Sequence, residues 1–175
     1  NNEFVQGWHS KVQFADSRDK ANEDTSAGAA GKSSLETKQS TFDWQNDIAI
    51  GIDTLQLLAS YRKEEVVSSA KPILNRARDT KSLAASYTMK RDQHLLNASL
   101  RRDKMSETGS TTTGSLGYGY QINNALRATA SYGTSFRQPT YNELYYPGYG
   151  IASNRPEKGR NAEVGLRYDD GKTQL

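Results

Sequence analysis

Apolar and polar residues alternate with a period of two along most of this chain, and no stretch shows a helical period. In a β-strand successive side chains point to opposite faces, so the pattern predicts strands with one apolar and one polar face. We expect an all-β antiparallel fold of about eight strands, followed by an unfinished strand at residues 173–175. The eight expected strands lie near residues 8–16, 41–50, 55–62, 83–90, 96–101, 115–120, 126–133 and 162–168.

The connections between these strands alternate between short and long. Short turns are expected near residues 51–53, 91–93, 122–124 and 169–172. Long loops are expected at residues 17–34, 66–80, 103–111 and 137–161. If the strands run up and down, all long loops lie at one rim and all short turns at the other. This arrangement is typical of a transmembrane β-barrel.

The composition fits a barrel with a polar interior better than a soluble globular protein. Hydrophobic residues make up only 34% of the chain and the mean hydropathy is −0.84, whereas soluble domains are roughly 45–50% apolar. Disorder is disfavoured by ten Tyr, two Trp and four Phe with a net charge of only +3. A soluble β-sandwich binding module, which also gives strands with one apolar face, is the alternative fold.

The distribution of charges and aromatic rings agrees with a wall in contact with lipid. Charged residues such as Lys11, Arg101 and Glu163 alternate with the apolar residues and are therefore expected on the opposite face of their strands. An Arg or Lys that faces lipid at the membrane midplane costs ~2–4 kcal/mol, which would enforce that separation. Aromatic residues on the apolar parity suit the girdles at membrane interfaces: Trp8, Trp44, Tyr61, Tyr87, Tyr120, Tyr132 and Tyr168.

Little in the sequence points to catalysis, metal binding or nucleic acid. The 23 basic and 20 acidic residues are interspersed, so the pI near 9.0 does not mark a nucleic-acid surface. Cysteine is absent, and the two histidines, His9 and His94, are far apart in sequence; we expect them to be solvated. The weak candidates for calcium are acidic residues of the expected loop 17–34 and its flank: Asp16, Asp19, Glu23 and Asp24. We therefore expect neither an enzyme nor a bound cofactor.

Two runs near the end of the chain identify a family. YGTSFRQPTYNELYYPGYG, followed by RPEKGRNAEVGLRY, resembles a signature of TonB-dependent outer-membrane receptors, and the variant here is most similar to the cobalamin receptors among them. The segment IASNRPEKGRN departs from the usual Asn-Pro-Asn-Leu lead-in to Pro-Glu. The resemblance implies energised uptake of a bulky, scarce nutrient across the outer membrane of a Gram-negative bacterium. The implied ligand is cobalamin, with a siderophore as the alternative.

The resemblance also implies that residues 1–175 form a section of one barrel domain. Receptors of this family are described as 22-stranded barrels with a plugged lumen. We expect the section to lack the plug domain, the motif that engages TonB and the closing C-terminal strand. Open strand edges leave backbone groups unpaired. An excised section is therefore expected to pair its edges with a second copy.

The aromatic segment between the last two strands is the candidate ligand site. Tyr side chains give contact area at low entropic cost, and Asn adds adaptable hydrogen bonds. The candidate ligand-binding residues are Arg137, Tyr141, Asn142, Tyr145, Tyr146 and Tyr149. The alternative role for this segment is structural, as a cap over the barrel or a surface that packs on the plug.

Overall fold

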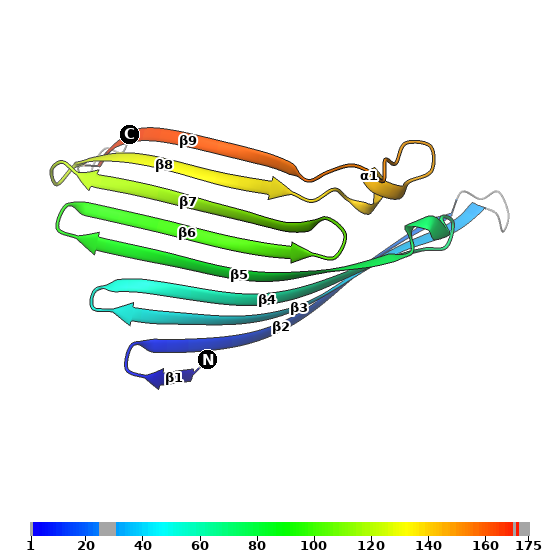
Figure 1. Ribbon diagram of the computed structural model, residues 1–175, viewed down its shortest axis with the longest axis horizontal. Helices are drawn as coiled ribbons and strands as arrows, with labels where there is room; N and C mark the ends of the chain where they lie inside the picture. The colour runs from blue at the N-terminus through cyan, green and yellow to red at the C-terminus, as the bar shows by residue number, and fades with distance from the viewer. Residues whose placement is uncertain (1, 25–30, 170, 172–175) are drawn as a thin grey trace.

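The computed structural model describes residues 2–24, 31–169 and 171. Within these residues nine strands form one antiparallel sheet in which each strand pairs with its neighbour in sequence (Figure 1). The strands are β1 (Asn2–Val5), β2 (Trp8–Asp24), β3 (Lys32–Ile50), β4 (Asp53–Ser68), β5 (Arg76–Arg91), β6 (His94–Met105), β7 (Gly109–Gln121), β8 (Leu126–Arg137) and β9 (Glu157–Tyr168). The eight expected strands are confirmed as β2 to β9, and β1 is an additional strand.

Short turns join the strands at one end of the sheet, as predicted. Ile50 pairs with Asp53 and Arg91 pairs with His94, so two-residue turns close the β3–β4 and β5–β6 hairpins. Tight hairpin turns require a left-handed backbone conformation. Gly51 supplies it at φ +65° without steric cost, and Asp92 supplies it at φ 50°. The unfinished strand expected at 173–175 lies outside the described residues.

At the opposite end, three of the expected long loops are shorter than predicted. Strands β2 and β3 occupy most of residues 17–34, and β4 and β5 enter the segment 66–80 from both sides. The connection expected at 103–111 is only the three residues between β6 and β7. Residues 138–156 form the longest described connection, which includes the short helix α1 (Tyr141–Tyr145).

The extra strand length was missed because neither face is apolar there. The upper part of a strand is here the part furthest from the short turns. In the upper part of β2 the register places Arg18 opposite Lys38 and Lys20 opposite Glu36, so the alternation of apolar and polar residues disappears while the backbone pairing continues. Arg18 makes an ion pair with Glu36 at 2.6 Å. Together with Lys38, it keeps the pKa of Glu36 below its ordinary value.

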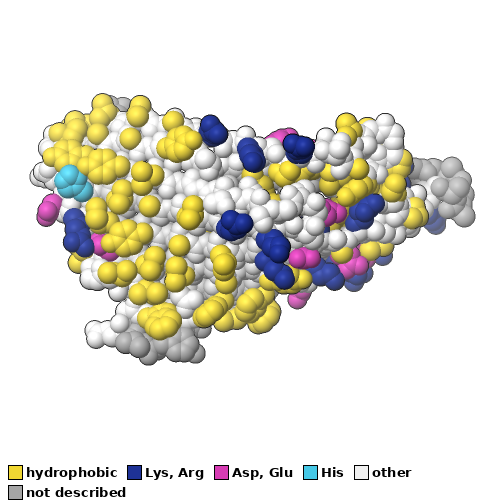
Figure 2. Space-filling model, in the orientation of Figure 1, with side chains coloured by type: hydrophobic (Ala, Val, Ile, Leu, Met, Phe, Trp, Pro, Cys, Tyr) yellow, Lys and Arg dark blue, Asp and Glu magenta, His cyan; other side chains and the backbone are white. Residues whose placement is uncertain are grey.

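The sheet has one apolar and one polar face. On the apolar face Leu83, Leu100 and Val164 are 67%, 61% and 88% exposed, and Figure 2 shows apolar side chains spread over this part of the molecule. A β-sandwich would bury these residues between two sheets. The described strands form a single sheet, so the sandwich alternative is wrong.

The polar face carries hydrogen-bonded side chains and small residues. Asp103 is buried and accepts hydrogen bonds from Ser82 and from the Arg101 guanidinium. Ser99 and Ser115 are hydrogen-bonded across β6 and β7 at 2.7 Å. Such a face suits the interior of a barrel, because these polar groups already have partners when water is limited.

A small apolar cluster lies on the polar-face side, where the segment 138–156 returns over the upper ends of the strands. Val66 of β4 and Leu74 of the 3₁₀ turn η2 (Pro72–Leu74) pack against Tyr141. Tyr145 at the end of α1 and Tyr146 directly after it complete the cluster. Within the described part of the chain, no helix is long and apolar enough to cross a membrane.

Candidate functional site

The segment 138–156, here called the rim loop, begins with a helix whose start is fixed by its sequence. Thr140 is the N-cap of α1: its hydroxyl accepts a hydrogen bond from the Glu143 amide at 3.2 Å. The Glu143 carboxylate accepts one from the Thr140 amide at 2.8 Å. This reciprocal capping box satisfies two backbone donors that a helix start leaves open.

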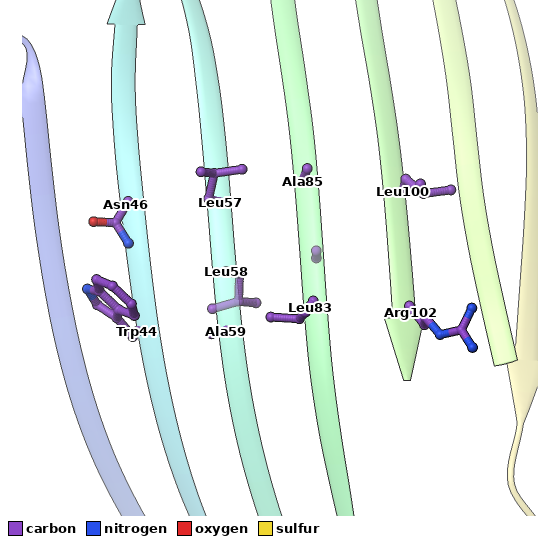
Figure 3. A pocket seen from close by; sticks show the side chains of 10 residues that line it. Trp44, Asn46, Leu57, Leu58, Ala59, Leu83, Ala85, Leu100 and Arg102 are labelled. Carbon is purple, nitrogen blue, oxygen red and sulfur yellow. The ribbon is translucent and has the colours of Figure 1, made fainter. Parts of the chain in front are cut away.

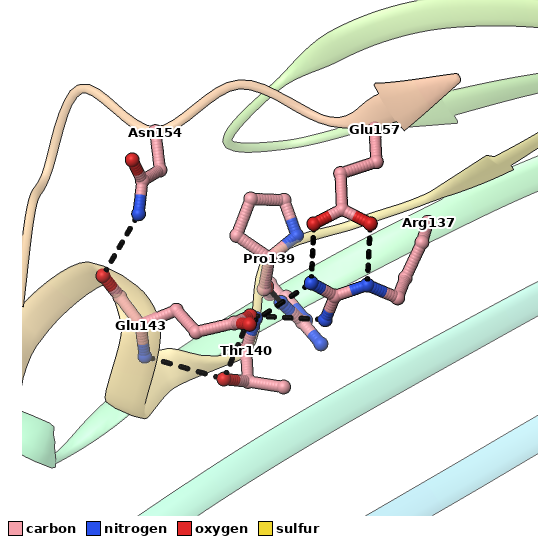
Figure 4. A network of polar contacts seen from close by, with 7 residues as sticks. Arg137, Pro139, Thr140, Glu143, Asn154 and Glu157 are labelled. Carbon is pink, nitrogen blue, oxygen red and sulfur yellow. Dashed lines mark hydrogen bonds and ion pairs between the residues drawn. The ribbon is translucent and has the colours of Figure 1, made fainter. Parts of the chain in front are cut away.

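Arg137 ties the two ends of the rim loop together (Figure 4). It is the last residue of β8 and lies opposite Glu157, the first residue of β9. Its guanidinium contacts Glu157 at 2.7 Å and Glu143 at 2.9 Å. These contacts raise the pKa of Arg137, and hydrogen bonds from Arg137 and Thr140 lower the pKa of Glu143 to about 2. The network therefore stays charged at any physiological pH.

Tyr141 anchors the rim loop to the polar-face side of the sheet. The side chain is 7% exposed, and burial raises the pKa of its phenol to about 12. The Arg78 guanidinium lies 4.6 Å from the centre of the Tyr141 ring. Arg78 also donates a hydrogen bond to the Pro139 carbonyl at 2.8 Å and pairs with Glu64 at 3.0 Å. One arginine thus holds both the ring and the backbone before the helix.

Two further tyrosines of the rim loop contact cations, one at the start of β5 and one directly before η2. Arg76 lies 3.7 Å from the centre of the Tyr145 ring, and Lys71 lies 4.6 Å from that of Tyr146. Such cation–π contacts fix the orientation of a ring and keep a positive charge beside it. Tyr149 stacks on Tyr146 with ring centres 4.7 Å apart and is 60% exposed.

Five of the six predicted ligand residues have defined partners within the protein, including Tyr149, which stacks on Tyr146. Arg137 belongs to the ion-pair network, and Tyr141, Tyr145 and Tyr146 are packed against cations. Asn142 and Tyr149 are exposed on the surface of the rim loop. The structure therefore brings the predicted residues together in the rim loop and at its base, with Arg137, Asn142 and Tyr149 on the exposed surface.

Sequence reasoning missed the cations that hold the rim loop. Lys71, Arg76 and Arg78 come from the segment 66–80, which was expected to be a loop without a specific role. The spacing of Arg76 and Arg78 places both on one face of a strand, which was the available signal. Their tyrosine partners lie more than sixty residues further along the chain, and nothing local in the sequence indicates those contacts.

The weak metal candidates do not form a site in the described residues. Asp16, Asp19, Glu23 and Asp24 lie along strand β2 instead of in a loop. Within the described ranges no three His, Cys, Asp or Glu side chains are close enough to hold a metal ion.

The two histidines lie on different strands. His9 is exposed on β2. His94 begins β6, and its ring nitrogen Nδ1 is 2.6 Å from the Tyr118 hydroxyl. Its ring also lies 5.2 Å from that of Tyr120, so these three residues form an aromatic group near the turn end of the apolar face.

Relatives with known names match this chain over most of its length. The vitamin B12 transporter BtuB of Vibrio vulnificus is 26% identical over 164 residues, which cover 91% of this chain and 27% of that protein. BtuB of Photobacterium profundum is 29% identical over 137 residues, covering 77% of this chain and 22% of that protein. The chain thus spans about a quarter of the length of these relatives.

Solved structures with the same fold include siderophore receptors. The ferric enterobactin receptor PfeA of Pseudomonas aeruginosa superimposes with a TM-score of 0.77 at 14% identity, over 94% of this chain and 30% of that chain. The siderophore receptor PirA of the same organism gives a TM-score of 0.68 at 16% identity, over 91% and 36%. At these identities the likeness concerns the fold. The family model of the TonB dependent receptor-like β-barrel matches residues 1–175, and the chain therefore belongs to that family.

Proposed function

We propose that this chain forms part of the wall and the extracellular rim of an outer-membrane transporter that takes up cobalamin. The observation that carries the proposal is the match, over 91% of the chain, to a protein named as a vitamin B12 transporter. In this arrangement the apolar face contacts lipid and the polar face lines the lumen. The end that carries the rim loop faces the outside of the cell, since longer loops are extracellular in such barrels.

The rim loop supplies a surface that suits a bulky ligand. Tyr149 and Asn142 are exposed on a segment that Arg137, Tyr141 and the capping box hold in place. A rigid aromatic ring beside an amide offers stacking and hydrogen bonding without a large ordering cost. No covalent step is needed: the ligand binds at the rim, and a plug domain coupled to TonB in the rest of the receptor gates its passage.

An anionic ferric siderophore is the second candidate ligand. Lys71 and Arg76 lie against the rings of Tyr146 and Tyr145, so the rim carries positive charge next to aromatic surface. A negatively charged iron chelate would gain from both features, whereas cobalamin would use chiefly the aromatic surface.

Equilibrium binding to the complete receptor distinguishes the two ligands. Cyanocobalamin and a ferric catecholate are titrated separately into the purified receptor and its Tyr149→Ala and Asn142→Ala variants. We expect cyanocobalamin to bind the unchanged receptor and to lose roughly 1–3 kcal/mol of affinity when the exposed ring is removed. Binding of the siderophore without cobalamin would overturn the proposed substrate.

A further inference from the structure

Towards the end of the sheet that carries the rim loop, basic residues replace apolar residues on the apolar face. Figure 2 shows apolar side chains over the turn end and the middle of the sheet, with Lys and Arg side chains where the apolar area stops. By strand parity the cations at this boundary belong to the apolar face. They are Lys63 of β4, Lys81 of β5, Arg102 and Lys104 of β6, and Lys158 and Arg160 of β9.

Three of these cations form a cluster whose side chains make no ion pair. Lys81 lies directly opposite Lys104 in the β5–β6 ladder, and Arg102 is two residues from Lys104 on the same face. Like charges directly opposite each other destabilise a sheet. Among the described residues none of the three has an ion pair or a side-chain hydrogen bond, and Asp79, on the same face two residues before Lys81, makes no ion pair with it.

Three arginines on the polar face, by contrast, have carboxylate partners. Arg62 and Arg78 make ion pairs with Glu64, and Arg101 pairs with Asp103. Beside the cluster, the sheet therefore supplies carboxylates to these three arginines of the polar face. It leaves Lys81, Arg102 and Lys104 without them at the edge of the apolar area, where an anion from outside the protein can reach them.

An apolar groove leads directly to this cluster (Figure 3). It has a volume of about 480 Å³, and its wall includes Trp44, Leu57, Leu83 and Leu100 around the small residues Ala59 and Ala85, with Arg102 at one end. A second hollow of about 640 Å³ shares Ala59, Leu83 and Arg102 with it. Lys81 and Lys104 line this second hollow, together with Phe42 and Tyr61.

We propose that this groove binds one lipid of the outer leaflet, the phosphorylated glycolipid lipopolysaccharide. An acyl chain lies along Leu57, Ala59 and Leu83, and a phosphate group is held by Lys81, Arg102 and Lys104. The inference rests on the placement in the outer membrane proposed above, because the cluster lies at the rim-loop end and so at the level of the outer-leaflet headgroups. A lipid phosphate near two lysines and an arginine removes their mutual repulsion.

The test measures lipid binding to the complete receptor in detergent by native mass spectrometry. The probe is bis-phosphorylated lipid A, compared with dephosphorylated lipid A and with phosphatidylglycerol. The test variant is the triple change Lys81→Gln, Arg102→Gln and Lys104→Gln. The matched control is Lys158→Gln with Arg160→Gln, which removes cations from the same face away from the groove. Heat-modifiable electrophoretic mobility verifies that each variant is folded.

We expect the triple variant to lose lipid A affinity by roughly tenfold or more and the control to change it by less than about threefold. Dephosphorylated lipid A should bind the unchanged receptor as weakly as lipid A binds the triple variant. If the test and control variants lose equal lipid A affinity, the effect comes from general surface charge and the inference is overturned. Equal, cluster-dependent binding of phosphatidylglycerol would overturn the choice of lipid.

A second variant tests the groove without altering charge. Ala59→Trp fills the space between Trp44 and Leu83, and we expect it to weaken lipid A binding while the cations remain. Unchanged binding would contradict an acyl chain in the groove. Cyanocobalamin binding by the same preparations is measured in parallel. The groove lies on the outer wall, so the two proposals can fail separately. If the receptor binds cobalamin but lipid A does not bind in the groove, only the lipid inference is overturned. If lipid A binds but cobalamin does not, only the proposed substrate is overturned.

Discussion

Arg137 determines the charge state of the residues at the base of the rim loop. Its guanidinium pairs with Glu143 and Glu157, which come from α1 and from the start of β9. Because hydrogen bonds from Arg137 and Thr140 lower the pKa of Glu143 to about 2 from an ordinary 4.5, ionised Glu143 favours the docked loop. That stabilisation is complete above about pH 5 and is lost as the pH falls from 4.5 towards 2.

Replacing Arg137 with Gln should raise the pKa of Glu143 towards 4.5, since the largest cause of its shift is removed while the hydrogen bonds from Thr140 remain. Carboxyl carbon chemical shifts of the complete receptor, followed from pH 6 to pH 2 by NMR with selectively labelled Glu, measure this change. Lys158→Gln serves as a control, because it removes a neighbouring cation that makes no ion pair with Glu143 in the described residues. A pKa that stays near 2 in the Arg137 variant would contradict the assigned cause.

Tyr141 contributes by packing more than by its hydroxyl group. Its ring is buried against Val66 and Leu74, whereas its hydroxyl donates a long hydrogen bond of 3.4 Å to the Glu64 carbonyl. We expect Tyr141→Ala to destabilise the docked rim loop by about 3 kcal/mol and Tyr141→Phe by less than about 1 kcal/mol. Limited proteolysis of residues 138–156 in the folded receptor measures the difference, and equal cleavage of both variants would show that the hydroxyl carries the anchoring.

At the scale of single elements, the sequence predicts a strand only where its two faces meet different surroundings. Alternation located the strands where one face is apolar, and the turn residues Gly51-Ile52 and Asp92-Gln93 located the short connections. The upper parts of β2 to β5 have polar residues on both faces, so backbone pairing is their only regular feature. Helix α1 is five residues long, too short for a helical period, and its start depends on the capping box of Thr140 and Glu143.

The upper part of β3 offers a direct test of this strand assignment. Residues 35–40 pair with β2 on one side and with β4 on the other. Their amides should therefore be protected from hydrogen exchange to a similar extent as those of residues 42–48. Thr37→Pro should remove that protection and cost at least about 1 kcal/mol, because Pro lacks the amide donor. Thr37→Ala keeps the donor and should leave protection intact; fast exchange of 35–40 in the unchanged protein would contradict the assignment.

At the scale of the whole molecule, the family and the separation of the two faces agree with a wall that has lipid on one side and a polar lumen on the other. The sequence predicted this arrangement through the parity of its charges, and the exposed Leu83, Leu100 and Val164 confirm which residues share the apolar face. The docking of the rim loop onto β4 and β5 could not be predicted, because it depends on pairs such as Arg78 and Tyr141 that only the folded sheet brings together.

Single arginines on the two faces should have unequal effects in a bilayer. Val164→Arg places a charge on the most exposed large apolar residue of the sheet and should destabilise the receptor by about 2–4 kcal/mol. Ser131→Arg is the matched change on the polar face, beside Glu163 in the register, and should cost much less. Denaturant unfolding of the complete receptor from phospholipid vesicles measures both. Equal costs would contradict the assignment of the apolar face to lipid.

The length of strands β2 to β5 has a consequence for the proposed capture of a ligand. These strands are 16 to 19 residues long, whereas a transmembrane strand needs about 9–11, so a stiff ladder continues well beyond the bilayer and supports the rim loop from below. If the rim loop binds the ligand as proposed, its surface is already preorganised before the solute arrives. Little folding of the surface then has to accompany each encounter, so capture can proceed at a rate set mainly by diffusion.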